Sequence, residues 1–64
     1  MKTKLIFENQ YYSACTLDND LIVQNKRSNK GIRILDNDAK EYIDSIITAI
    51  DDDERSFICK SLLN

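Results

Sequence analysis

The sequence predicts one small α+β domain over residues 1–64, in which an antiparallel β-meander of three to four strands is followed by an amphipathic helix and a shorter C-terminal helix. Three observations predict it. The chain has 64 residues, the length of a single small domain. Apolar and polar residues alternate through the N-terminal half, as in strands. From Asp36 onward, apolar residues instead recur with the period of a helix, about 3.6 residues.

Aromatic and β-branched residues, which favour a pleated surface, are frequent in the N-terminal half. They fall into four strand-like segments, at 2–8, Tyr11–Leu17, Leu21–Lys26 and Ile32–Leu35. In the second segment we expect Cys15 and Leu17 to face the core. Tyr11 and Tyr12 fall on opposite faces, so one of them should lie off the core, either half-buried or as an anchor at a partner surface.

Short turns connect these segments. Asp18, Asn19 and Asp20 form the clearest turn signal, because Asn and Asp tolerate left-handed backbone and bond their own main chain. Gly31 is the only glycine of the chain, and we expect it to supply a positive φ angle in the turn that begins at Arg27. Because each connection is short, neighbouring strands should be antiparallel.

The long amphipathic helix is predicted over residues 36–50. Asp38 and Glu41 have the spacing of a capping box, in which each side chain bonds a backbone N–H of the first turn. One apolar stripe follows at helical spacing, formed by Ala39, Tyr42, Ile43, Ile46, Ile47 and Ile50.

Four acids follow this stripe, and they predict a second helix. Acids oppose the macrodipole at a helix C-terminus and favour it at an N-terminus. Asp51 and Glu54 also repeat the capping-box spacing, so we expect a break near Ile50 and a new helix near Asp52. The alternative is one continuous helix of roughly 39 Å, whose overhang would need a second subunit.

The core is expected between the sheet and the helical half. Its predicted members are Leu5, Phe7, Cys15, Leu17, Leu21, Val23, Ile32 or Ile34, Tyr42, Ile43, Ile46, Ile47, Ile50 and Phe57. The C-terminal segment adds Ile58, Leu62 and Leu63, which exceed what one thin sheet needs to cover. This surplus predicts a homodimer.

Cys15 and Cys59 are the only cysteines. We expect two buried or half-buried free thiols, with a disulfide or an intermolecular pair as the alternatives. The apolar run near the N-terminus stops at Glu8, short of a signal-peptide core, and no stretch is long enough to cross a membrane. A cytoplasmic protein without a targeting segment is therefore predicted.

The composition argues against enzymes, cofactors and metals. Histidine is absent, which removes the commonest general base and the usual partner of a Ser or Cys nucleophile. A single glycine allows no glycine-rich phosphate loop. A calcium-binding EF-hand loop that started at Asp36 would need Gly where Glu41 stands and Glu where Ile47 stands. We expect no catalytic, cofactor or metal site.

Charge is uneven along the chain. Residues 36–54 contain eight acids and a single base, Lys40. The simplest interpretation is a solvated helix face, but such carboxylates can also meet a basic surface on another protein. We therefore predict a small, non-enzymatic protein-interaction module, a regulator or inhibitor, whose acidic helical face comprises Asp44, Asp51, Asp52, Asp53 and Glu54.

The alternative function is single-stranded nucleic-acid binding by a basic hairpin turn with Lys26, Arg27, Lys30 and Arg33. The segment Gly31–Leu35, which runs into an acidic cap and the helix of Tyr42 and Ile43, resembles the end of the positive-cofactor family of single-strand-binding proteins. That resemblance covers about a third of the chain and implies a sheet followed by a helix, working as a dimer. The upstream strands lack the basic, aromatic face such a binder uses, and the sequence pI near 4.8 opposes this function.

Overall fold

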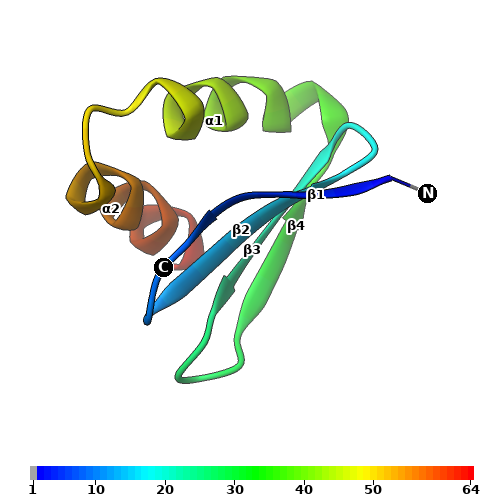
Figure 1. The fold of residues 1–64 in the computed structure, drawn as a ribbon. Coiled ribbons are helices and arrows are strands. Elements are labelled where there is room, and N and C mark those ends of the chain that lie inside the picture. The colour runs from blue at the N-terminus through cyan, green and yellow to red at the C-terminus, as the bar shows by residue number, and fades with distance from the viewer. Residues whose placement is uncertain (1) are drawn as a thin grey trace.

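The structure is a computed structural model that describes residues 2–64. Four strands precede two helices (Figure 1): β1 (Thr3–Glu8), β2 (Tyr12–Leu17), β3 (Asp20–Asn25), β4 (Gly31–Ile34), α1 (Asp36–Thr48) and α2 (Asp52–Leu63). The strands form one antiparallel sheet in the order β1-β2-β3-β4. The predicted α+β meander followed by two helices is confirmed.

Asp and Asn residues adopt the left-handed backbone of the turns, whereas Gly31 does not have a positive φ angle. Asp18 has φ 56° between β2 and β3, and Asn29 has φ 59° between β3 and β4. The prediction of a positive φ at Gly31 is wrong. A Cβ at Gly31 would lie 3.0 Å from Gln24 Cγ and 3.2 Å from the Val23 carbonyl oxygen. Glycine is needed there because β4 approaches β3 closely.

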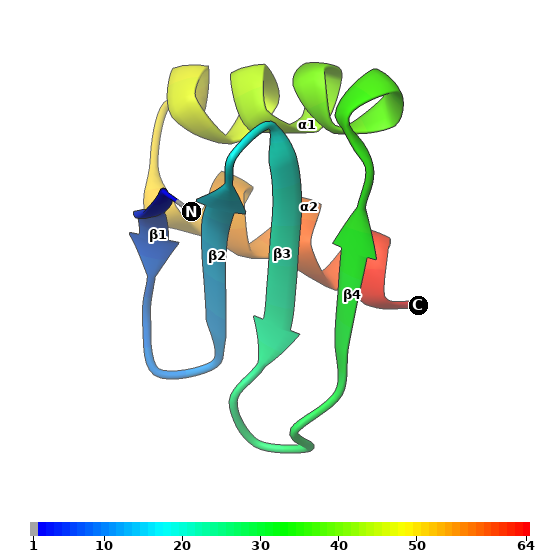
Figure 2. The ribbon, with the colours of Figure 1, turned by 90° about the vertical axis from the view of Figure 1, so that its right-hand side faces the viewer.

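Both helices cover the same face of the sheet. Figure 2 shows the sheet in front, α2 behind it and α1 across the ends of the strands. Both helices contact β3, and they also contact each other. The face that points toward the viewer in Figure 2, called the outer face below, has no helix over it. The covered side is called the inner face.

The core lies between the inner face and the helices. Its fully or nearly buried members are Phe7, Ala14, Leu21, Val23, Ala39, Ile46 and Cys59. The sequence correctly assigned Phe7, Leu21, Val23 and Ile46 to it. Partly buried side chains, including Ile32, Ile34 and Ile43, pack around it.

The prediction that Leu5, Cys15 and Leu17 belong to this core is wrong, because they lie on the outer face. The strand register pairs Ala14 with Val23 and Cys15 with Ile22, so Ala14 shares the buried face. An irregularity in β1 between Leu5 and Phe7 then reverses the alternation, so Phe7 points inward while Leu5 pairs with Cys15. Leu5 is 56% exposed.

Four residues of the C-terminal half that were assigned to the core are also exposed, so the prediction is wrong for them. Tyr42 is 40%, Ile47 58%, Phe57 69% and Ile50 90% exposed. Of the predicted stripe on α1, only Ala39, Ile43 and Ile46 pack against the core. Ile50 falls in the connection between the helices, where no strand reaches it.

The two helices begin differently. α1 begins at Asp36, as predicted, but the predicted capping box of Asp38 and Glu41 is wrong, because Leu35 is the cap residue and makes no side-chain cap bond. Instead the Asp36 N–H donates to Asp20 Oδ1 on β3 at 3.0 Å, a contact between segments that local spacing cannot show. For α2 the predicted break near Ile50 and cap at Asp51 are confirmed, since Asp51 Oδ1 accepts the Glu54 N–H at 2.9 Å.

The two cysteines lie on opposite sides of the sheet and are both free thiols. Cys15 is half-buried on the outer face, and Cys59 is fully buried in the core. Burial raises the pKa of Cys59 to about 11. Within residues 2–64, neither helix has the length and apolar character that a membrane span requires.

Candidate protein-binding surface

Most of the predicted acidic face gathers where α2 begins, and these acids hold the connection between the helices. The Asp51 carboxylate caps α2 as described above. The Glu54 carboxylate accepts the N–H of Ile50, the residue before the cap residue Asp51, at 3.2 Å. Asp52 forms an ion pair with Arg55 at 2.9 Å. Three of the five predicted binding acids therefore have structural partners.

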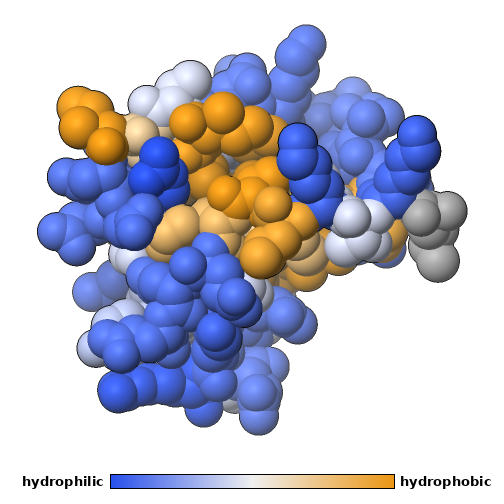
Figure 3. All heavy atoms as spheres, viewed as in Figure 1, coloured by the Kyte–Doolittle hydropathy of each residue, from blue (hydrophilic) through white to orange (hydrophobic). Residues whose placement is uncertain are grey.

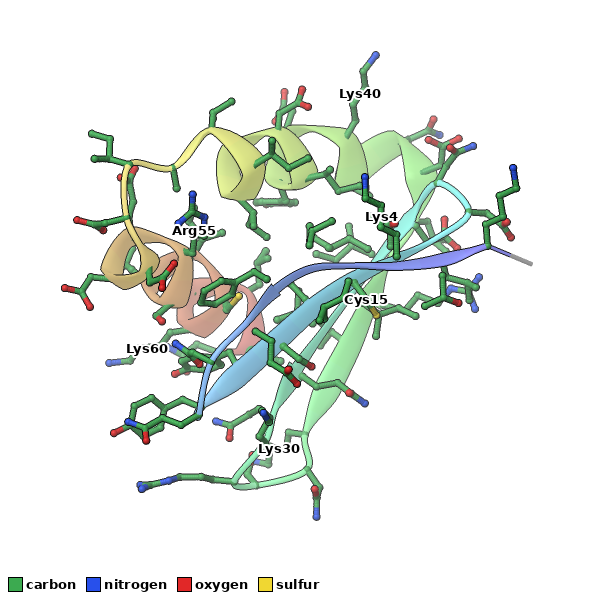
Figure 4. All side chains as sticks on the ribbon, viewed as in Figure 1. Lys4, Cys15, Lys30, Lys40, Arg55 and Lys60 are labelled. Atoms are coloured by element: carbon green, nitrogen blue, oxygen red, sulfur yellow. The ribbon has the colours of Figure 1, made fainter. Side chains whose placement is uncertain are left out.

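Arg55 completes this connection, and the sequence analysis did not single it out. Its guanidinium donates to the carbonyl oxygens of Ile46 at 3.0 Å and of Ala49 at 2.9 Å. These carbonyls lie at the end of α1, where helical partners are missing. Figure 4 shows Arg55 between the two helices. A lone base directly after four acids was the only available signal in the sequence.

Asp44 and Asp53 are different, because their carboxylates have no hydrogen bond or ion pair with residues 2–64. They do not lie together. Asp44 lines a hollow near the β2–β3 turn with Asp18 and Asp36, whereas Asp53 lies in the first turn of α2. Residues 2–64 contain no cluster of His, Cys, Asp or Glu that could hold a metal ion.

An apolar groove between α1 and α2 is the feature that sequence analysis missed. A hollow of about 270 Å³ is lined by Tyr42, Ser45, Phe57, Ile58, Ser61 and Leu62. A second hollow of about 460 Å³ adjoins it and extends to β4, sharing Tyr42 and Leu62 and adding the acids Asp38 and Glu41. The two hollows together are called the helix groove below. It could not be found from the sequence, because it depends on the angle and spacing of two separate helices.

A second apolar surface lies at the free edge of β1. Figure 3 shows apolar side chains gathered between β1 and the helices. The hollow there is lined by Leu5, Ile6, Phe7, Ile46 and Ile47, together with Lys4, Asp52 and Arg55. Charges of both signs therefore border this surface, whereas the helix groove has only acids.

The predicted basic hairpin is partly neutralised. Lys26 forms an ion pair with Glu8 at 3.2 Å, and Arg33 forms one with Asp20 at 2.6 Å on the outer face. The Arg27 guanidinium lies 4.9 Å from the centre of the Tyr11 ring, a cation–π contact.

Lys30 is the remaining predicted base. It lines a hollow of about 220 Å³ with Lys60, a residue that sequence spacing did not connect to the hairpin. Figure 4 shows both at the end of the molecule away from Lys4 and Lys40. The four predicted bases therefore do not form one continuous surface.

Comparisons of this chain with protein-family models, with curated proteins and with solved structures gave no match.

Proposed function

We propose that this chain is a non-enzymatic protein-interaction module, a small regulator or inhibitor that binds another protein through its two helices. One observation carries the proposal: large apolar side chains of the helical half lie exposed, with Phe57 69% and Ile50 90% exposed. Burying such side chains favours association, and aromatic residues often anchor protein interfaces. The fold itself does not need them, because its core closes without them.

Acidic side chains lie next to these exposed apolar residues. Asp53 has an unpaired carboxylate in the turn before Phe57, and Asp51, Asp52 and Glu54 lie beside Ile50. Asp44 adds an unpaired carboxylate on α1. Acids around an apolar centre steer a basic partner toward the surface and disfavour acidic ones. The acids of the connection thus have two roles in this proposal, holding α2 in place and attracting the partner.

Two finer expectations belong to the same proposal. A cytoplasmic location is supported by the two free thiols, because a reducing compartment keeps thiols unpaired. A homodimer is the other predicted use of the surplus apolar residues, and it would compete with a partner protein for the same exposed side chains. Sedimentation at tens of micromolar tests the homodimer, and a stable monomer would exclude it.

The function is tested by affinity purification from cell lysate with the full chain as bait. The double variant Ile50→Ser with Phe57→Ser removes the exposed apolar side chains, and Leu17→Ser is the control on the outer face, away from both helices. We expect one protein to bind the wild type and the control and to bind the double variant at least about ten-fold less. The protein is then identified, purified and titrated. If no protein binds, or if the same proteins bind all three baits equally, the proposal is wrong.

Single-stranded nucleic-acid binding remains the alternative. One observation favours it, since Lys60 joins Lys30 beside Tyr12 at the hairpin end. The ion pairs of Lys26 and Arg33 oppose it. Titration with a single-stranded oligonucleotide separates the two functions, because only phosphate binding predicts an affinity that falls steeply with salt.

A further inference from the structure

We infer that the helix groove binds a basic amphipathic helix of the partner protein, with apolar side chains on one side and Lys or Arg on its flanks. This inference rests on the proposed function and names the class of partner and the place where it binds. Its basis is the combination of apolar sides, small residues between them and lining charges that are all negative.

The shape of the groove suits a helix. α1 and α2 run in opposite directions (Figure 2), and the groove follows the line between them toward β4. Phe57, Ile58 and Leu62 supply an apolar side from α2, and Tyr42 supplies one from α1. An amphipathic helix laid along such a groove inserts side chains at helical spacing, a recurrent mode of recognition.

Two small residues lie between the large side chains of the groove. Ser45 on α1 and Ser61 on α2 line the hollow between the larger side chains. The Ser45 hydroxyl donates to the Glu41 carbonyl oxygen at 2.9 Å, so its own helix already satisfies it. An apolar side chain of the partner can therefore contact Ser45 without leaving that hydroxyl unpaired.

The charges of the rim select a basic occupant. Asp38 and Glu41 line the groove, and Asp53 precedes Phe57 by about one helical turn. Among residues 2–64, no Lys or Arg lines either hollow of the groove.

The basic residues of the two helices lie outside the helix groove. Arg55 donates to carbonyl oxygens at the end of α1, Lys60 lines the hairpin hollow, and Lys40 lines the hollow beside Asp18. An acidic segment or a nucleic acid would therefore meet like charge in the groove, whereas Lys or Arg would meet carboxylates.

The same charges disfavour a second copy of this chain. In a symmetric dimer built on this groove, Asp38 and Glu41 of one copy would approach the same two acids of the other. Like charges placed opposite one another cost binding free energy, and the groove offers no base to offset them.

The test uses the full-length chain and three synthetic peptides of about five helical turns. The first has leucines on one face and lysines on the other, the second replaces the lysines with glutamates, and the third replaces the leucines with serines. Binding is measured by fluorescence anisotropy, and the bound surface is mapped by amide chemical shifts. We expect the leucine–lysine peptide to bind at least about ten-fold more tightly than either other peptide and to shift Tyr42, Ser61 and Leu62 most.

Matched variants separate the groove from general attraction to an acidic protein. The pair Asp38→Asn with Glu41→Gln removes two charges from the rim, and the pair Glu8→Gln with Asp36→Asn removes two charges elsewhere. We expect the rim pair to weaken peptide binding by about ten-fold and the other pair by less than about three-fold. Phe57→Ala should also weaken it, whereas Leu5→Ala should not.

Three results would overturn the inference. The first is an equal loss of affinity in both charge pairs, and the second is a largest shift outside the groove. The third is a dimer that Phe57→Ala dissociates, because a second copy would then occupy the groove. If affinity purification still yields a partner that Ile50→Ser with Phe57→Ser loses, the proposed function survives these failures. If no partner is found, the proposed function fails separately.

Discussion

The inner and outer faces of the sheet carry similar apolar residues, yet only one of them forms a core. On the inner face, Ala14, Leu21 and Val23 have no exposed surface. On the outer face, Leu5 is more than half exposed, and Ile22 is only half-buried. The comparison teaches that hydrophobicity alone does not choose the buried face.

Side-chain size and position explain the difference. Ala14 lies between Phe7 and Val23 in the register. Its short side chain projects little from the centre of the inner face, so a helix can approach the sheet closely there. The corresponding outer row runs from Leu5 through Cys15 and Ile22 to Arg33, so it ends in a charge. The inner row continues from Val23 to Ile32 and is apolar throughout, so a helix can pack closely against it without burying a charge.

The largest expected effect compares two adjacent residues of β3. Leu21→Ala should lower the free energy of unfolding by about 3 kcal/mol, because Leu21 is fully buried and its removal leaves a cavity. Ile22→Ala on the outer face should lower it by no more than about 1 kcal/mol. Urea denaturation followed by circular dichroism measures both. Equal losses would show that the outer face is covered in solution.

The second test uses the buried thiol. Well below pH 9.0, the pKa of this thiol in the unfolded chain, Cys59 is neutral in both states. As the pH rises toward about 11, the unfolded chain loses this proton while the raised pKa lets the folded protein keep it. Stability should therefore fall, by about 2 kcal/mol near pH 10.5. Urea denaturation at about pH 8 and pH 10.5 measures this fall.

Other groups also titrate in this range, so the contribution of Cys59 is a difference between proteins. Cys59→Ala should show a smaller fall than the wild type, whereas Cys15→Ala should show the wild-type fall. A thiol reagent should label Cys15 in the folded protein and Cys59 only on unfolding. Equal falls in the wild type and Cys59→Ala, or rapid labelling of Cys59, would contradict its burial.

A smaller effect is expected at the start of α2, which covers the inner face together with α1. Asp51→Ala should lower the free energy of unfolding by about 1 kcal/mol, because the Glu54 N–H loses its acceptor. Thermal denaturation monitored by circular dichroism is the measurement. Asp53→Ala, which removes an acid of the same turn without a side-chain partner, should remain close to the wild type. A comparable loss in both would attribute the effect to charge near the helix dipole rather than to the cap.

The smallest effect belongs to the ion pair of the outer face. Arg33→Ala should cost about 0.5 kcal/mol, because the Arg33 side chain is 55% exposed and ion pairs that reach solvent contribute little. Asp20→Ala should cost more, about 1 kcal/mol, since its carboxylate also accepts the Asp36 N–H where α1 begins. Chemical denaturation of both variants makes the comparison. If Arg33→Ala proved the more costly, the outer face would depend on this ion pair.

Features with local physical causes could be predicted. Turn residues and alternation predicted the four strands, and the spacing of Asp51 and Glu54 predicted the break and the cap of α2. The acids of the candidate site were found in the same way, as a run in the sequence. The role of Arg55 beside these acids was not predicted, because Arg55 donates to carbonyl oxygens of the preceding helix.

The sequence by itself determined which segments form strands and helices and that neighbouring strands pair in a meander, because caps, turns and periodicity act over a few residues. Only the tertiary structure decided which sheet face is buried, where α1 begins, which isoleucines are exposed and that a groove with an acidic rim lies between the helices. The register of β2 with β3, the irregularity in β1 and the Asp20 contact to α1 join residues far apart in the chain. The free energy of such contacts depends on a three-dimensional arrangement that no local spacing encodes.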